Sequence, residues 1–355
     1  MESALLWYNE IKGTLETEGF KMNDVDPCVF NKLDANGNQV TVVVYVDDLL
    51  VTCADRKSID DVHNMLISKY KEANRVDGPV INYVGMTLDF SNEGKVVVSM
   101  KKYVDDILSL YEVNGSATTP ATMSLFTIDP DAEKLSTKMR EIFHSRVAKL
   151  LYLAKRVRVD FLLPISFLAT RVTCADVDDW RKLERVLNYL NFTKELVLTL
   201  EPSGYDITGC ADASYGTHFD LKSHSGSTAT LGKGTMYAQS TKQKLNTRSS
   251  TEAEFVAASD FTSRVVSFRD FMIAQNHKVG PATIYQDNTS TIKLIKNGRY
   301  SSVRTKHIAS RYYFITDRIR TNDIRVQYLP TYDMLADLLT KPLQGNLFKR
   351  LRDKF

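Results

Sequence analysis

The sequence predicts a multidomain protein of mixed α+β and α/β class, on three observations. The chain has 355 residues, which corresponds to two or three domains at roughly 150 residues per domain. β-Branched and aromatic runs alternate with amphipathic helical patterns before residue 130 and after residue 205, whereas the segment between them is nearly all helical in pattern. Hydrophobic residues make up 43% and charged residues 25% of the chain, which is typical of folded globular proteins and excludes collagen-like and broadly disordered classes.

The first 130 residues predict an α+β domain that begins with an amphipathic helix. The dipeptide Asn36-Gly37 lies between two strand-like runs and is typical of a β-hairpin turn. Asp47 and Asp48 separate the second run from a third, so this acidic pair is expected at a turn between two strands. The expected strands here are 29–33, 40–46, 49–52, 82–90 and 95–100, and the expected helices are 5–20, 58–73 and 102–111.

After a linker at 115–131, the apolar spacing of 140–195 predicts helices that connect two larger parts. From residue 205 the pattern changes to strands and helices in the order βββαβαβα. The strands are expected at 206–212, 225–231, 235–240, 282–286 and 324–329, and the helices at 250–276, 290–297, 306–320 and from 332 onward. We therefore expect domains at 1–130, 131–200 and 201–355.

The net charge of +3 conceals an uneven distribution along the chain. Residues 1–130 hold 11 Lys+Arg and 20 Asp+Glu, for a net charge of −9. Residues 131–200 hold 13 and 9, for +4, and residues 201–355 hold 22 and 14, for +8. A basic field favours a polyanionic partner, and acidic clusters within it are candidate metal sites.

The sequence predicts an intracellular protein, cytoplasmic or nuclear, with no membrane partner. No apolar run approaches the 18 or more residues that a membrane helix needs, and the N-terminus has neither the basic nor the apolar region of a secretory signal. The four cysteines are scattered without a Cys/His cluster, so we expect reduced, buried thiols rather than a zinc or disulfide scaffold.

Four carboxylates of the last part have the order that a two-metal nuclease requires. They are Asp212 at the end of the first strand, Glu254 in the long helix, Asp287 after the fourth strand and Asp337 in the last helix. Cleavage of a phosphodiester by water uses two divalent ions, and Mg²⁺, with Mn²⁺ as its substitute, prefers carboxylate oxygens. Taken singly, Asp212 equally suits a strand-end turn, and Asp287 equally suits a helix N-cap.

Five motifs in this part resemble the ribonuclease H domain of copia-type (Pseudoviridae-like) retrotransposon Pol polyproteins. They are Cys210-Ala211-Asp212-Ala213-Ser214, Ser249-Ser250-Thr251-Glu252-Ala253-Glu254-Phe255, Tyr285-Gln286-Asp287-Asn288, Arg304-Thr305-Lys306-His307-Ile308 and Ala336-Asp337-Leu338-Leu339-Thr340-Lys341-Pro342-Leu343. The resemblance implies a ribonuclease H-like mixed sheet flanked by helices, and an endonuclease that cleaves RNA in RNA–DNA hybrids. It favours Glu254 over Glu252, because Glu-Phe-Val-Ala resembles the family's signature.

The front part resembles the reverse transcriptase of the same polyproteins. Tyr45-Val46-Asp47-Asp48 resembles the hairpin of a polymerase palm, and the resemblance extends over nearly the whole chain. It implies that 1–130 is a partial palm and thumb and that 131–200 is a helical connection. In the family the fingers and the first catalytic aspartate precede this region, so Asp47 and Asp48 are expected to form an incomplete RNA-directed DNA polymerase site. The missing N-terminal reverse transcriptase segment is then a possible partner.

Basic residues near the carboxylates are candidates for binding the hybrid through its phosphates. They are Lys242, Lys244, Arg248, Lys306 and His307. A solvated surface is the alternative for the basic residues, and helix capping or a phosphate contact is the alternative to catalysis for His307. For the whole chain, the alternatives to a hybrid nuclease are a non-catalytic, domesticated hybrid-binding protein and an inactive transposon remnant.

Overall fold

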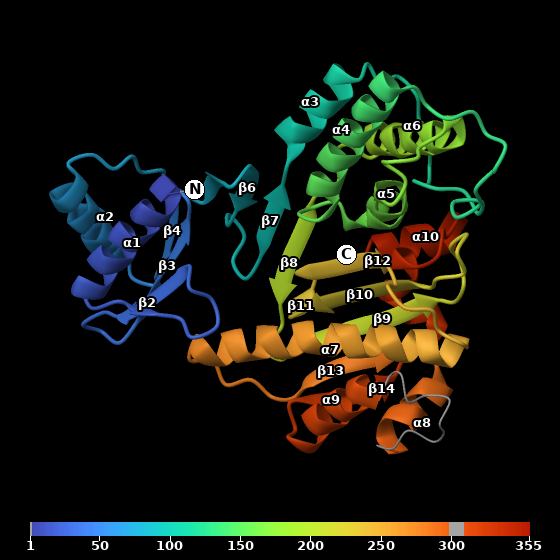
Figure 1. Ribbon diagram of the computed structural model, residues 1–355. Coiled ribbons are helices and arrows are strands. Elements are labelled where there is room, and N and C mark those ends of the chain that lie inside the picture. The colour runs from blue at the N-terminus through green and yellow to red at the C-terminus, as the bar shows by residue number, and fades with distance from the viewer. Residues whose placement is uncertain (1, 298–308) are drawn as a thin grey trace. The chain divides into compact units, whose positions relative to one another are not determined.

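The computed structural model describes residues 2–297 and 309–355, which form two compact units. The first unit comprises the residues up to Ser91 together with Ser267–Lys278, and the second comprises Asn92–Val266 and Val279–Phe355. Figure 1 shows their helices and strands. The three-part division at residues 130 and 200 stays a prediction.

The first unit has an antiparallel sheet of order β1-β2-β3-β4, as the hairpin signals predicted. Its elements are α1 (Glu2–Thr17), β1 (Lys21–Met22), β2 (Val29–Leu33), β3 (Gln39–Tyr45), β4 (Asp48–Thr52) and α2 (Arg56–Tyr70). Alternate residues of β3 point inward, and Val40, Val42 and Val44 pack with apolar side chains of α1 and α2. This apolar cluster is the core of the first unit.

A further hairpin in this unit replaces the single strand expected at 82–90. It consists of β5 (Val80–Tyr83) and β6 (Met86–Asp89), in which Tyr83 pairs with Met86. Val84 and Gly85 turn the chain with φ angles of 50° and 74°. A two-residue turn of this kind needs positive φ, which glycine adopts readily but valine does not, so Val84 concealed the turn in the sequence.

The second unit contains the helices expected between residues 131 and 200. Its N-terminal elements are β7 (Val96–Ser99), α3 (Lys101–Leu110), α4 (Thr137–Ala154), the 3₁₀ helix η1 (Val159–Phe161), α5 (Leu162–Ala169) and α6 (Val177–Phe192). Asp176 caps α6 through a reciprocal hydrogen bond with Asp179. The strand β8 (Leu198–Pro202), which the sequence did not predict, pairs with β7 and with the short β11 (Gly232–Lys233).

A mixed five-stranded sheet of order β12-β10-β9-β13-β14 dominates the rest of the second unit. Its strands are β9 (Thr208–Ser214), β10 (His224–Thr230), β12 (Tyr237–Lys242), β13 (Ala282–Gln286) and β14 (Ile324–Tyr328). The first three strands are antiparallel, whereas β13 runs parallel to both β9 and β14. The long helix α7 (Ser250–Ala274) runs along the sheet (Figure 1), and its Ala253 and Ala257 pack against Ala213 of β9.

Two helices, α8 (Thr289–Asn297) and α9 (Ala309–Arg320), follow β13 in the described part of the chain. The single helix expected from Tyr332 is wrong. The structure instead has the 3₁₀ helices η3 (Thr331–Asp333) and η4 (Leu335–Leu339), and then α10 (Gly345–Arg352). Pro342 explains the break, because proline lacks the N–H of a helix interior and disfavours helical geometry at the residue before it.

No helix among the described residues is both long enough and apolar enough to span a membrane. All four cysteines are free thiols, as expected. Cys210 is buried, but Cys174 is exposed, so the expectation that all four are buried is wrong.

Candidate metal centre

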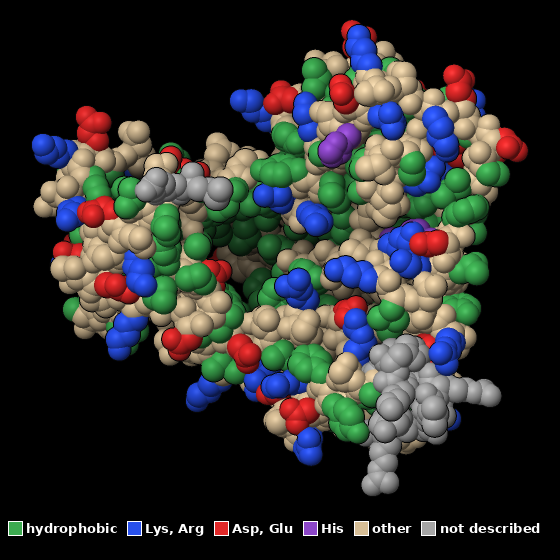
Figure 2. Space-filling view, in the orientation of Figure 1, with side chains coloured by type: hydrophobic (Ala, Val, Ile, Leu, Met, Phe, Trp, Pro, Cys, Tyr) green, Lys and Arg blue, Asp and Glu red, His purple; other side chains and the backbone are tan. Residues whose placement is uncertain are grey.

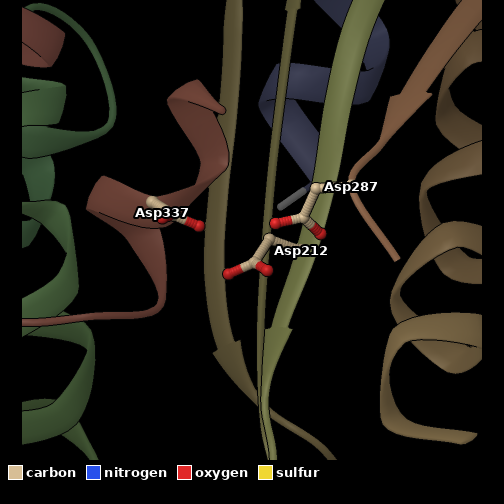
Figure 3. A group of neighbouring side chains, drawn as sticks. All are labelled: Asp212, Asp287 and Asp337. Atoms are coloured by element: carbon tan, nitrogen blue, oxygen red, sulfur yellow. The ribbon is translucent and has the colours of Figure 1, made fainter. Parts of the chain in front are cut away.

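Three of the four predicted carboxylates converge in the second unit. One ligand oxygen from each of Asp212, Asp287 and Asp337 lies within 4.8 Å of the others. Asp212 lies near the end of β9, and Asp287 follows β13, the parallel neighbour of β9, so both side chains reach the same edge of the sheet. Asp337 lies on η4 and faces them from across the site (Figure 3). Residues 125 positions apart in the sequence thus share one site.

The close approach of η4 to the sheet depends on Gly226. Gly226 is the β10 partner of Asp212 in the antiparallel register. A Cβ atom at this position would lie 2.7 Å from side-chain atoms of both Leu339 and Thr340. A residue without a side chain at this point therefore allows η4 to bring Asp337 next to Asp212.

Glu254, the fourth predicted residue, lies beside the three aspartates but outside the group that spans 4.8 Å. It is buried, and it accepts a hydrogen bond from Gln286 Nε2 at 3.2 Å. Burial, together with the negative charges of Asp212 and Asp287, raises the pKa of Glu254 to about 10. Burial and charge repulsion thus disfavour the ionised form of Glu254, and a cation in the site would oppose both effects.

Glu252 forms hydrogen bonds with the backbone and a side chain at the start of α7. Its carboxylate accepts a hydrogen bond from the backbone N–H of Arg248 at 2.8 Å, and its own N–H donates to Ser249 Oγ at 3.2 Å. These bonds satisfy amide groups at the start of α7 that have no partner within the helix. The two glutamates, two positions apart, thus face different surroundings.

Polar side chains that the sequence did not single out surround the aspartates. The Thr340 hydroxyl donates a hydrogen bond to Asp212, and Thr331 Oγ1 donates to Asp287 at 2.7 Å. Lys341 Nζ lies 2.7 Å from Asp337 Oδ1 and 3.4 Å from Asp212. Thr340 and Lys341 follow Asp337 within one motif of the sequence. This proximity could have indicated that both residues lie at the site.

The donor set fits a divalent cation. Buried carboxylate oxygens are hard ligands of the type that Mg²⁺ and Mn²⁺ prefer. Burial and the charge of Asp212 raise the pKa of Asp337 to about 7, and the charge of Lys341 opposes this rise. A divalent cation would relieve this repulsion.

The predicted basic residues have different surroundings. Lys242, at the end of β12, forms an ion pair with Asp220 at 2.8 Å, whereas Lys244 and Arg248 are exposed in the segment before α7. Lys306 and His307 lie outside the described residues. Figure 2 shows Lys and Arg side chains gathered on the face of the second unit where β10 and β12 lie.

The acidic pair of the first unit lies where the sequence placed it, at the turn between β3 and β4. Tyr45 pairs with Asp48, so Val46 and Asp47 form the turn, and both aspartates are exposed. Val46 has a φ of 51°, and its carbonyl accepts a hydrogen bond from Trp7 Nε1 at 2.7 Å. No group of three metal-ligating side chains within 4.8 Å includes Asp47 or Asp48 in residues 2–297 and 309–355.

The second unit has the mixed sheet flanked by helices that the motifs implied, with Asp212 and Asp287 near the ends of adjacent parallel strands. Residues 1–124 match the family model described as reverse transcriptase (RNA-dependent DNA polymerase). This match agrees with the resemblance of the front part to the reverse transcriptase of copia-type Pol polyproteins.

The chain is also similar to Pol polyproteins of plant transposons. The chain is 25% identical over 98% of its length to the Retrovirus-related Pol polyprotein from transposon TNT 1-94 of Nicotiana tabacum, and covers 26% of that protein. It is 28% identical over 98% of its length to the Pol polyprotein from transposon RE2 of Arabidopsis thaliana, and covers 24% of it. The chain thus spans about a quarter of the length of these curated relatives.

Among solved structures, the LC11-RNase H1 isolated from compost aligns at 16% identity with a TM-score of 0.31. The alignment covers 38% of this chain and 93% of that one.

Proposed function

We propose that this protein is a divalent-metal-dependent endoribonuclease that cleaves the RNA strand of RNA–DNA hybrids. The convergence of Asp212, Asp287 and Asp337 within 4.8 Å carries the proposal, since two buried carboxylates and one half-buried carboxylate from separate parts of the fold form a single cluster of hard ligands. Glu254 completes the proposed catalytic and metal-binding set. The basic C-terminal part, with a net charge of +8 over residues 201–355, supports a polyanionic substrate.

The aspartates would hold the cation, with Mg²⁺ as the proposed metal and Mn²⁺ as its substitute. When bound, the metal activates water and stabilises the charge that develops on the phosphate. Gln286 holds Glu254 at the edge of the cluster, and Thr331 and Thr340 hold Asp287 and Asp212 by hydrogen bonds. These contacts fix the carboxylates before a substrate arrives, which lowers the cost of reorganisation.

Lys242, Lys244 and Arg248 are proposed to contact the hybrid through its phosphates. Lys244 and Arg248 are exposed in the segment that leads into α7, the helix that carries Glu254. Contacts of this kind position the nucleic acid without reading its bases. Lys306 and His307 remain candidates from the sequence. We propose that the protein works within the cell, in the cytoplasm or the nucleus.

Asp287→Asn tests the nuclease. The full chain should cut a labelled RNA–DNA hybrid in Mg²⁺ or Mn²⁺, and the variant should lose at least about 100-fold in rate, because a metal ligand loses its charge. Fluorescence anisotropy should show hybrid binding within about twofold of the wild type, because Lys and Arg supply the phosphate contacts. Asp270→Asn, which changes an exposed acid on α7, is the matched control.

A salt series separates this proposal from its alternatives. Salt-dependent binding by the wild type without cleavage in either metal contradicts the nuclease and supports a hybrid-binding protein. Neither binding nor cleavage by the folded chain supports an inactive remnant.

A further inference from the structure

The ammonium group of Lys341 lies among the carboxylates of the proposed metal centre. Its Nζ atom is 2.7 Å from Asp337 Oδ1 and 3.4 Å from both carboxylate oxygens of Asp212. Both aspartates are almost fully buried, whereas 35% of the Lys341 side chain is exposed. The ammonium group of this partly exposed lysine thus pairs with two of the three aspartates.

The local backbone aims Lys341 at the site. Asp337 and Lys341 are four positions apart at the end of η4, and the Lys341 N–H donates to the Asp337 carbonyl at 2.8 Å. The neighbouring Thr340 is fully buried and bonded to Asp212, so the backbone at this point is held by its own contacts. The long lysine stem remains partly in solvent, and it can rotate away without unfolding the turn.

Lysine and a divalent cation would compete for the same oxygens. An ammonium group 2.7 Å from a carboxylate oxygen occupies the approach of a cation that must contact that oxygen at roughly 2.0–2.1 Å, the Mg²⁺–oxygen distance. A +1 charge at this position also repels a +2 ion in a site of low dielectric constant. The two cations would therefore crowd and repel each other at Asp337 and Asp212 in the present geometry.

We propose that Lys341 is a displaceable counter-ion, which neutralises Asp212 and Asp337 in the metal-free protein and withdraws when a divalent cation binds. The inference rests on the proposed function, because it takes these aspartates as metal ligands. Lys341 therefore stabilises the metal-free fold and sets the metal concentration at which the site fills.

Calorimetric titration of the full chain with Mn²⁺ alone tests the inference. Lys341→Met should bind Mn²⁺ about tenfold more tightly than the wild type, since a neighbouring positive charge is removed. The melting temperature in EDTA should fall for this variant, and its rise on adding Mn²⁺ should be larger than in the wild type. Lys138→Met, which removes one exposed lysine from α4, should change neither quantity.

Lys341→Arg supplies an independent test should Lys341→Met fail to fold. A guanidinium group pairs with two carboxylate oxygens at once, so it should resist displacement and weaken Mn²⁺ binding several-fold. Unchanged or weaker binding by a folded Lys341→Met, or unchanged or tighter binding by Lys341→Arg, overturns the inference.

Asp212→Asn separates this inference from the proposed function. Loss of Mn²⁺ binding in Asp212→Asn, together with unchanged binding in Lys341→Met, leaves the metal centre intact and overturns only the role of Lys341. Unchanged binding in Asp212→Asn overturns the metal centre itself, and the inference with it.

Discussion

The Thr340 hydroxyl donates a hydrogen bond to the buried carboxylate of Asp212, although 128 positions separate the two residues. The bond ties the end of η4 to β9. A charged group without water needs such a donor, and removing it leaves the acceptor unsatisfied.

Thr340→Val should lower the free energy of unfolding by about 1–3 kcal/mol, because it deletes the donor and keeps the shape. Urea denaturation of the metal-free chain measures the change. Thr340→Ser keeps the hydroxyl and should lose less stability than the valine variant. A larger loss for Thr340→Ser than for Thr340→Val would mean that the methyl group, not the hydrogen bond, holds η4.

The two glutamates of α7 should differ in function. Glu254→Gln should lower the rate of hybrid cleavage by at least about 100-fold, because the proposed metal centre loses a carboxylate. Glu252→Gln should stay within about threefold of the wild type, because a glutamine oxygen can still accept the Arg248 N–H bond. Single-turnover assays of both variants decide the assignment, which fails should Glu252→Gln be the inactive one.

Gly226→Ala should destabilise the protein by about 1–3 kcal/mol, because its new Cβ would lie 2.7 Å from side-chain atoms of Leu339 and Thr340. Cleavage should fall as well, since η4 carries Asp337. Gly13→Ala is the matched control: Gly13 lies within α1 and has open space around it, so alanine there should stabilise by about 0.5–1 kcal/mol. Thermal unfolding measures both changes.

A buried histidine pair should make stability depend on pH. His218 Nε2 lies 3.0 Å from His224 Nδ1, and His224 Nε2 lies 2.7 Å from Ser240 Oγ, which donates to the Leu339 carbonyl. Burial lowers the pKa of His218 to about 4. The charge of Lys242 lowers this pKa further, and the charge of Asp220 raises it. Burial and the proximity of His218 lower the pKa of His224 to about 3.

Both folded pKa values lie below the ordinary value of 6.5, so the unfolded chain binds more protons as the pH falls below 6.5. The stability that the two neutral histidines contribute is therefore fully present above pH 6.5 and is lost as the pH falls. Between pH 6.5 and 4.5 the free energy of unfolding should fall by about 2–3 kcal/mol per imidazole. Urea denaturation across this range should show a shallower slope for His224→Gln, whereas His144→Gln, at an exposed position on α4, should keep the full slope.

The 355-residue chain should not extend a primer. A polymerase site needs acidic ligands gathered around its metals, and no group of three that includes Asp47 or Asp48 exists among the residues that the structure describes. An assay with a primed RNA template, dNTPs and Mg²⁺ measures this. Incorporation that disappears in Asp47→Asn would show that a further ligand completes the site.

Much of the second unit follows from local sequence patterns. The strand 282–286 was predicted at its observed bounds. Alternating apolar residues and turn residues act over a few positions, so the sequence displays them directly. Two predictions from the apolar pattern were wrong. The strand expected at 82–90 is interrupted by a turn at Val84, and the helix expected from residue 332 is interrupted near Pro342.

The sequence by itself predicted that Asp212, Asp287 and Asp337 come together, because each lies within a short motif at the end or start of a regular element. Only the tertiary structure showed that Glu254 lies outside the group of three aspartates. It also showed that Gly226 allows η4 to approach the sheet, and that Lys341 pairs with two of the aspartates. These facts depend on distances between segments more than 100 positions apart. Such distances follow from the packing of the sheet, η4 and α7, and side-chain packing of this kind leaves no periodic signal in the sequence.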